Sequence, residues 1–145
     1  MNKFQEILKE LLDEKSLSRL ALAKILNISS TTINGYFNNG YYPDIKIAVK
    51  IAKYFDCSLD YLFGFSDQRK NLETNKNTFI NNFTTIIKEN NLSIAQAMKA
   101  LNMSEYNYYR WKNGLFPRTN NLIEIVKYFN VSLDFLVGDV KWGFF

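Results

Sequence analysis

The chain has 145 residues, of which 47% are hydrophobic and 22% charged, and its formal net charge is +4. This composition favours one or two packed domains, and no apolar run reaches the roughly 18 residues that a membrane helix needs. One cysteine and no histidine exclude a disulfide framework within the chain and remove the commonest catalytic base and metal ligand. We therefore expect a cytoplasmic binding protein, not an enzyme, with no membrane association, cofactor or metal.

The first residues of the chain show apolar side chains at helical spacing. The apolar residues Phe4, Ile7, Leu8, Leu11 and Leu12 recur at the i, i+3, i+4 spacing of one helix face. This spacing predicts an amphipathic first helix with a buried side.

Two serines mark the next helices. Ser18 is the predicted N-cap of a short helix that runs to about Leu26, and Ser29 is the predicted N-cap of a third helix that ends near Asn39. Asn27 lies between them, and asparagine tolerates the left-handed conformation of a tight turn.

A proline and another serine mark the last two helices of this segment. Pro43 is predicted in the first turn of a fourth helix, and Ser58 is predicted to cap a fifth over residues 59–63. The fourth helix would bury Ile45, Ala48, Val49, Ala52 and Phe55. Cys57 is expected to be a small buried apolar group.

The same pattern recurs later in the chain. Residues 53–64 match residues 127–138 at an offset of 74, and residues 26–29 match 101–104 at an offset of 75. Because the matches keep their order through the whole unit, we infer two copies of one supersecondary unit. The predicted divisions are a first domain at 1–66, a polar linker at 67–77, a second domain at 78–139 and an aromatic tail at 140–145.

The second copy repeats the helix signals of the first. The corresponding stripe, N-caps, turn residue and proline are Phe79, Phe83, Ile86, Ile87, Ser93, Ser104, Ser132, Asn102 and Pro117. With five helices in each copy and no β-alternation, the predicted fold class is all-α.

The second and third helices, joined by a three- to four-residue turn, form a helix-turn-helix. With the Leu26–Ile33 segment and the Ser58–Gly64 ending, the first copy resembles the lambda-repressor-like (Cro, phage-repressor, XRE) family of DNA-binding domains. The second copy resembles it through residues 101–104, 111–114 and 132–134. The resemblance implies two tandem five-helix domains that bind double-stranded DNA.

In such a unit the third helix enters the major groove, and flanking groups contact phosphates. The DNA-binding candidates of the first copy are Arg19, Ser29, Ser30, Thr31, Thr32, Asn34 and Asn38. Those of the second copy are Ser104, Glu105, Tyr106, Asn107, Tyr109, Arg110, Lys112 and Arg118. Ile33, Tyr36, Tyr108 and Trp111 are expected to point inward.

Several positions depart from the family pattern. Arg19 replaces the usual glutamine and can still contact a phosphate, whereas Ile94 in the second copy cannot. Met98 replaces a small alanine, which is Ala23 in the first copy, so the helices of the second copy would have to separate or rotate slightly. Glu105 could accept a hydrogen bond from cytosine but repels phosphate.

Some roles stay open. Arg19 is a phosphate clamp or an ordinary solvated arginine, and Arg110 reads guanine or belongs to a solubilising or protein-binding surface. Ser29 and Ser104 are helix caps first, with phosphate contact a secondary role. Tyr106 and Tyr109 suit DNA contact and protein contact equally.

The predicted function is a sequence-specific transcriptional regulator, a repressor of phage or mobile-element type. The alternative is a protein-binding antirepressor, or an inhibitor of a nucleic-acid enzyme, built on the same fold. Trp142, Phe144 and Phe145 in the tail either fold onto the second domain or dock on a second copy of the chain or another protein partner.

Overall fold

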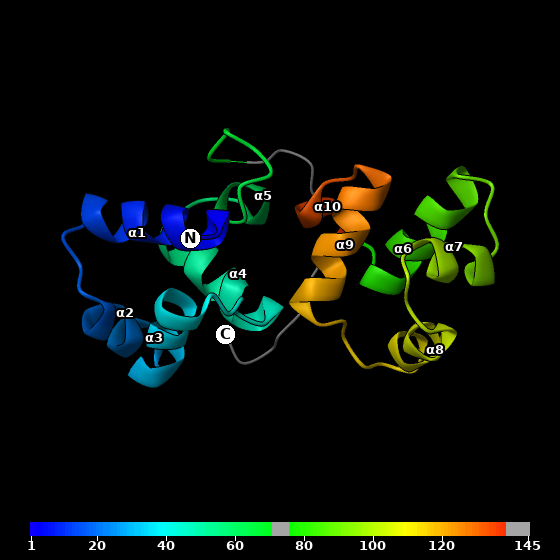
Figure 1. Ribbon diagram of the computed structural model, residues 1–145. Coiled ribbons are helices and arrows are strands. Elements are labelled where there is room, and N and C mark those ends of the chain that lie inside the picture. The colour runs from blue at the N-terminus through cyan, green and yellow to red at the C-terminus, as the bar shows by residue number, and fades with distance from the viewer. Residues whose placement is uncertain (71–75, 139–145) are drawn as a thin grey trace. The chain divides into compact units, whose positions relative to one another are not determined.

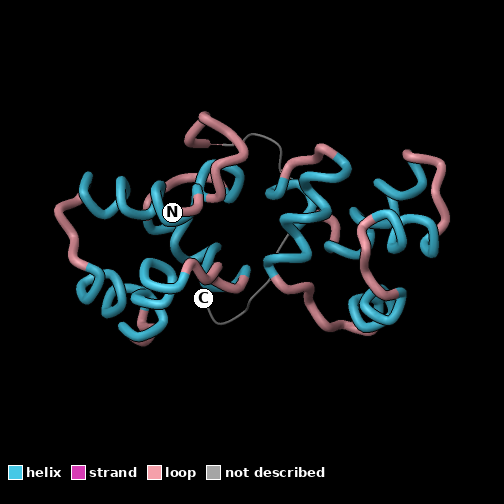
Figure 2. The backbone as a smooth tube through the Cα atoms, in the orientation of Figure 1, coloured by secondary structure: helices cyan, strands magenta, loops and turns pink. Residues whose placement is uncertain are grey.

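The computed structural model describes residues 1–70 and 76–138, which divide into two compact units. Across these residues the chain forms ten helices and no strand. Figures 1 and 2 show how short loops connect the helices within each unit. The all-α prediction is therefore confirmed for the described residues. None of the helices in this part of the chain is long and apolar enough to cross a membrane.

The first unit consists of five helices in the order expected from the caps (Figure 1). They are α1 (Lys3–Glu14), α2 (Arg19–Leu26), α3 (Ser30–Asn39), α4 (Ile45–Tyr54) and α5 (Leu59–Leu62). Ser18, Ser29 and Ser58 are the N-caps of α2, α3 and α5, and each side-chain oxygen accepts a hydrogen bond from a backbone N–H of the first turn. The predicted caps are confirmed.

An aromatic cluster lies in the core of the first unit. The Phe4 ring stacks on Phe63 with 5.2 Å between centroids and meets Tyr36 edge-on at 5.6 Å. The buried Gln5 side chain donates from Nε2 to the Tyr36 carbonyl at 2.6 Å, and Asn2 caps α1. These contacts join α1 to α3 and α5, and so they hold α3 in a fixed position against the core.

The second unit has its own five helices. They are α6 (Phe79–Glu89), α7 (Ile94–Ala100), α8 (Glu105–Lys112), α9 (Thr119–Phe129) and α10 (Leu133–Val137). The Trp111 ring lies edge-on to Phe79 and Phe83, at 5.6 and 5.7 Å. Asn82, 2% exposed, donates to the Phe135 carbonyl at 2.9 Å and so joins α6 to α10.

The methionine that replaces a small alanine has a small residue beside it where the first unit has a large one. Leu22 and Ala23 on α2 correspond to Ala97 and Met98 on α7, and all four side chains are buried. The large and small positions have therefore exchanged places between the two units.

The structure corrects the expected places of both prolines and of one cysteine. Pro43 and Pro117 precede the helices, because α4 begins at Ile45 and α9 at Thr119. Asp44 is the N-cap of α4, and its Oδ1 accepts from the Ile47 N–H at 2.9 Å. Proline lies one residue before the cap, where no N–H is required. Cys57, expected to be buried, is partly exposed.

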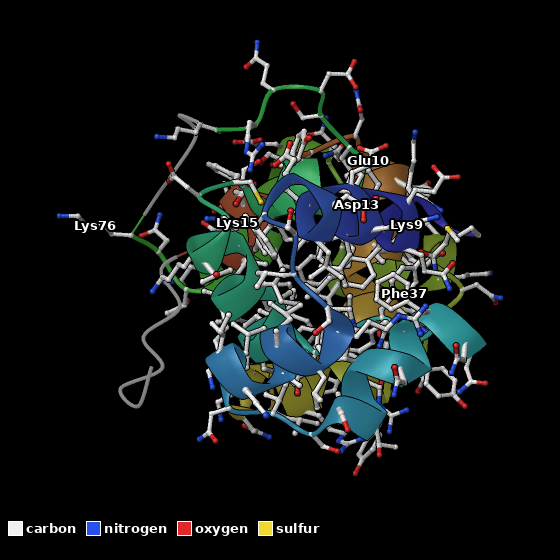
Figure 3. All side chains as sticks on the ribbon, turned by 90° about the vertical axis from the view of Figure 1, so that its left-hand side faces the viewer. Lys9, Glu10, Asp13, Lys15, Phe37 and Lys76 are labelled. Atoms are coloured by element: carbon white, nitrogen blue, oxygen red, sulfur yellow. The ribbon has the colours of Figure 1, made fainter. Side chains whose placement is uncertain are left out.

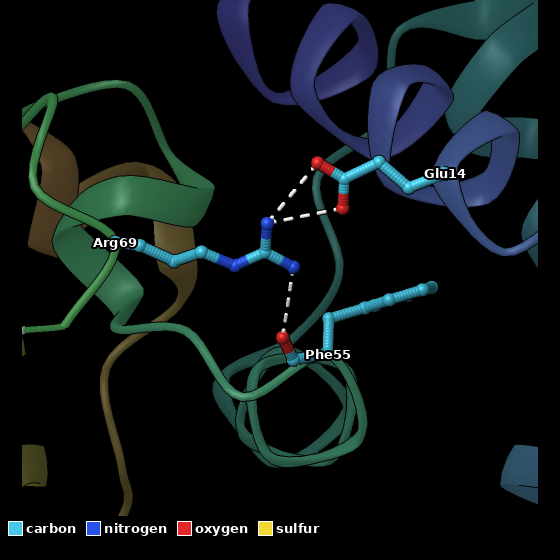
Figure 4. Close-up of polar contacts among 3 residues, drawn as sticks. All are labelled: Glu14, Phe55 and Arg69. Carbon is cyan, nitrogen blue, oxygen red and sulfur yellow. Dashed lines mark hydrogen bonds and ion pairs between the residues drawn. The ribbon is translucent and has the colours of Figure 1, made fainter.

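Residues 67–70, which the sequence assigns to the linker, contact the first unit. Arg69 Nη1 lies 3.1 and 3.0 Å from the two carboxylate oxygens of Glu14, and Nη2 donates to the Phe55 carbonyl at 3.1 Å (Figure 4). The Ser58 N–H donates to the Arg69 carbonyl at 2.7 Å, and Lys70 pairs with Asp56 at 3.0 Å. The compact part of the first unit thus continues past α5.

Candidate nucleic-acid interface

Helices α2 and α3 form a helix-turn-helix whose turn is closed by the backbone. Asn27 adopts the left-handed conformation at φ 55°, and the Ile28 N–H donates to the Ala23 carbonyl at 2.9 Å. Ile33 and Tyr36 are 0% and 3% exposed, so α3 is anchored by one face, as the sequence predicted. The other face of α3 is exposed to solvent.

The candidate residues of the first unit gather on that outer face. Arg19, Ser29, Thr31 and Asn38 are exposed, and Ser30, Thr32 and Asn34 are partly exposed. No charged side chain lies on α3 itself, because the helix reads STTINGYFNN. Any charged side chain near this face must therefore come from a neighbouring helix or loop.

Arg19 provides such a charge and is attached to α3. Its Nη1 donates to Asn34 Oδ1 and Asn38 Oδ1, both at 3.4 Å, and its guanidinium carbon lies 4.1 Å from the Phe37 ring centroid. The sequence analysis named Arg19, Asn34 and Asn38 separately and missed Phe37. The spacing of Asn34, Phe37 and Asn38 over one helical turn is the signal that could have grouped them.

A shallow hollow of about 300 Å³ adjoins this cluster, with Lys9, Asp13, Ser18, Arg19 and Phe37 among its lining residues. Figure 3 shows Lys9 and Asp13 on α1 on the same side of the unit as Phe37 on α3. Lys9 thus adds a second cation beside Arg19 and was not singled out from the sequence. Asp13 partly offsets that charge.

A larger hollow, of about 490 Å³, lies between α3 and the segment leading into α4. Its lining includes Thr31, Thr32, Gly35, Tyr36, Tyr41 and Asp44. A Cβ atom on Gly35 would lie 3.2 Å from Tyr41 Cδ2, so the glycine lets this aromatic ring approach the helix closely. The 62% exposed Tyr41 ring thereby forms one wall of the hollow.

Tyr36 has a buried hydroxyl with no hydrogen-bond partner among the described residues. Burial, and secondarily the nearby negative charge of Asp44, raise the pKa of Tyr36 well above its ordinary value. Its neutral form is therefore the one that the folded state favours.

The second unit has a corresponding helix pair, α7 and α8, and the outer face of α8 differs in chemistry from that of α3. Ser93 and Ser104 cap α7 and α8, Asn102 is left-handed at φ 58°, and Tyr108 and Trp111 are buried as predicted. The outer face of α8 consists of the exposed Glu105, Tyr106, Tyr109, Arg110 and Lys112 and the partly exposed Asn107.

Two of these exposed side chains form a pair. Arg110 lies one turn after Tyr106, with its guanidinium carbon 5.6 Å from the ring centroid. Tyr106 and Tyr109 are 67% and 52% exposed. Arg118 is the N-cap of α9 but makes no side-chain capping bond, in contrast to Asp44 of the first unit.

The tail residues Trp142, Phe144 and Phe145 lie outside the described residues. Within the described ranges, no group of three or more acidic, cysteine or histidine side chains could hold a metal ion.

Comparison with known proteins identifies a helix-turn-helix domain in the first unit. The helix-turn-helix family model matches residues 8–62. An uncharacterised HTH-type transcriptional regulator of Rickettsia prowazekii (strain Madrid E) is 37% identical over 62 residues, covering 40% of this chain and 67% of the relative. A similarly described regulator of Rickettsia conorii (strain ATCC VR-613 / Malish 7) is also 37% identical over 62 residues, covering 40% of this chain and 57% of the relative.

No solved structure gives a significant match to the chain. The family match covers α2, α3, α4 and α5 in full and includes the anchored helix pair described above. Through this N-terminal helix-turn-helix domain, the chain belongs to the helix-turn-helix family.

Proposed function

We propose that the chain is a sequence-specific DNA-binding transcriptional regulator that represses by occupying a promoter. The observation that carries this proposal is the α2–α3 pair within residues 8–62, whose family match coincides with a solvent-facing, capped third helix. In this fold the third helix lies in the major groove while the second crosses the backbone.

In the first unit, α3 would present Ser30, Thr31, Thr32 and Asn34 to base edges. Ser29 caps α3, and the positive dipole end at the first turn of this helix suits a phosphate. Arg19, held beside α3 by Asn34 and Asn38, would contact the backbone with the rest of its guanidinium, which carries five N–H donors.

The second unit is proposed as a second helix-turn-helix domain. Supporting this are its five helices, its serine caps at Ser93 and Ser104 and its left-handed Asn102, which repeat the first unit. Arg110 would contact guanine and Glu105 cytosine N4, while Arg118 and Lys112 would contact phosphates. Asn107, Tyr106 and Tyr109 complete this face.

Two linked units would bind one DNA molecule more tightly than either alone, because the first raises the effective concentration of the second. Their outer faces differ: α3 carries no charge, whereas α8 carries Glu105, Arg110 and Lys112. The preferred site is therefore expected to be asymmetric.

Selection of bound sites from random duplex DNA tests the proposal. The full chain should enrich one asymmetric site, and binding should weaken as salt rises because counterions are released from phosphates. Arg19→Ala together with Arg110→Ala should weaken binding and flatten the salt dependence. Lys88→Ala together with Lys127→Ala is the control, since it removes the same total charge from exposed positions on α6 and α9. Enrichment of no site would refute the proposal.

A second candidate function is favoured by the exposed tyrosines of α8. Tyr106 and Tyr109, more than half exposed on one short helix beside Arg110, resemble the residue types that concentrate in protein interfaces. In this case the second unit would bind a protein, as in an antirepressor. A stable protein complex by gel filtration, with no DNA retained at 50 or 200 mM salt, would support this function over the first.

A further inference from the structure

The outer face of α3 poses a problem of selectivity. Its groups are hydroxyls and amides, with no charged side chain, whereas the corresponding face of α8 carries Arg110. Serine and threonine hydroxyls donate and accept, and so they distinguish bases weakly. If the first unit discriminates between sequences, another feature of this face must contribute.

The hollow beside α3 is that feature. Thr31, Thr32 and Gly35 line it from α3, and Tyr41 and Pro43 line it from the following segment. Gly35 lets the Tyr41 ring form a wall of the hollow, because Tyr41 Cδ2 lies only 3.2 Å from where a Cβ of this residue would be. At the corresponding position α8 has Arg110, which has a long charged side chain.

The chemistry of the hollow is mainly apolar. Tyr41, Pro43 and Ile47 line it, beside the polar residues Thr31, Thr32 and Asp44. Of the four bases, thymine alone presents a methyl group in the major groove. An apolar hollow on the groove-facing side of the third helix therefore matches thymine and no other base.

We propose that the hollow formed by Thr31, Thr32, Gly35 and Tyr41 receives the 5-methyl group of a thymine, so that the first unit selects thymine at one fixed position of its site. The proposal rests on the proposed function, because it requires α3 to lie in the major groove. Gly35 and Tyr41 become specificity-determining residues, although neither offers a hydrogen bond to a base edge in this role.

Replacement of single thymines by deoxyuracil tests this directly. Deoxyuracil removes the methyl group and keeps the pairing edge and the O4 acceptor. Burial of one methyl group corresponds to about fourfold in affinity. With the full chain on its selected site, one thymine should show a three- to tenfold loss on replacement, and the other positions less than twofold.

Two variants test whether the thymine methyl group binds in the hollow. Tyr41→Ala removes one wall, and Gly35→Ser adds a side chain that presses on the Tyr41 ring and narrows the hollow beside it. In both variants the loss at the sensitive thymine should shrink to below twofold. Tyr128→Ala, at an exposed tyrosine on α9, is the control and should leave the deoxyuracil loss unchanged. Circular dichroism establishes that each variant is folded.

The outcomes separate the two proposals. A selected site in which no thymine is sensitive would overturn the role of the hollow and leave DNA binding intact. A sensitive thymine whose loss is unchanged in Tyr41→Ala and Gly35→Ser would also overturn it, because the methyl group would then lie elsewhere. Failure to select any site would overturn the proposed function and the hollow together.

Discussion

Arg69 is expected to stabilise the first unit although it follows the last helix of that unit by seven residues. Its guanidinium joins the end of α1, at Glu14, to the end of α4, at the Phe55 carbonyl (Figure 4). Replacement by methionine keeps most of the side-chain volume and removes all three hydrogen bonds.

The magnitude follows from exposure and geometry. The side chains of Arg69 and Glu14 are 39% and 49% exposed, so solvent screens the ion pair and its contribution is about 0.5 to 1 kcal/mol. The bond to the Phe55 carbonyl adds about 1 kcal/mol. Arg69→Met should therefore lower the free energy of unfolding of the first unit by about 1.5 to 2 kcal/mol, and its Tm by roughly 6–16 °C for a domain of this size.

Tryptophan fluorescence makes this measurable in the full chain. Trp111 is buried in the second unit, so fluorescence in a Trp142→Phe background reports that unit, while far-UV circular dichroism reports both units. In urea, Arg69→Met should shift the unfolding transition of the first unit, which circular dichroism detects and tryptophan fluorescence does not. Arg69→Lys keeps the charge without the planar fork and should recover less than half of the loss.

A double-mutant cycle between Arg69→Met and Glu14→Gln checks the assignment of the ion pair. The coupling energy should be about 0.5 to 1 kcal/mol. An unchanged dichroism transition in Arg69→Met, or an equal shift of the fluorescence transition, would refute the reasoning that this residue stabilises the first unit specifically.

Three further predictions concern the two cores and one cap. Met98→Ala should destabilise the second unit by about 2 to 5 kcal/mol, measured by fluorescence in urea, and adding Ala97→Leu should recover part of the loss by restoring the order of the first unit. Tyr36→Phe should be neutral or slightly stabilising at pH 7, because the buried hydroxyl has no partner among the described residues. Above about pH 10 the unfolded state loses the Tyr36 proton while the folded state keeps it, so stability should fall by up to about 1.4 kcal/mol per pH unit, and Tyr36→Phe should remove that part of the fall. Arg118→Asp should stabilise α9 by about 0.5 to 2 kcal/mol in the same urea assay by supplying the cap that Asp44 supplies to α4, and an unchanged transition would contradict this capping argument.

Local features of the structure follow from local sequence. Ser18, Ser29, Ser58, Ser93 and Ser104 cap helices where the sequence predicted them, because a cap bond joins groups only two or three residues apart. The left-handed Asn27 and Asn102 depend in the same way on the intrinsic tolerance of asparagine. The inward faces of α3 and α8 follow from the helical period alone.

Contacts between distant residues could not be predicted in this way. The sequence shows that Leu22 and Ala23 correspond to Ala97 and Met98, but only the structure shows that all four side chains are buried. Arg69 reads as part of a polar linker, and the partners that hold it are 14 and 55 residues away.

The features of the candidate interface also divide into those set by local sequence and those set by tertiary packing. The sequence by itself determined that α3 presents small polar groups outward and that a glycine interrupts them. The tertiary structure decided that Arg19 is held against Asn34 and Asn38, and that Tyr41 packs over Gly35 to border an open hollow. The reason is physical: a helix face is set by a period of 3.6 residues, whereas a hollow exists only where separate segments are brought together by a core they share.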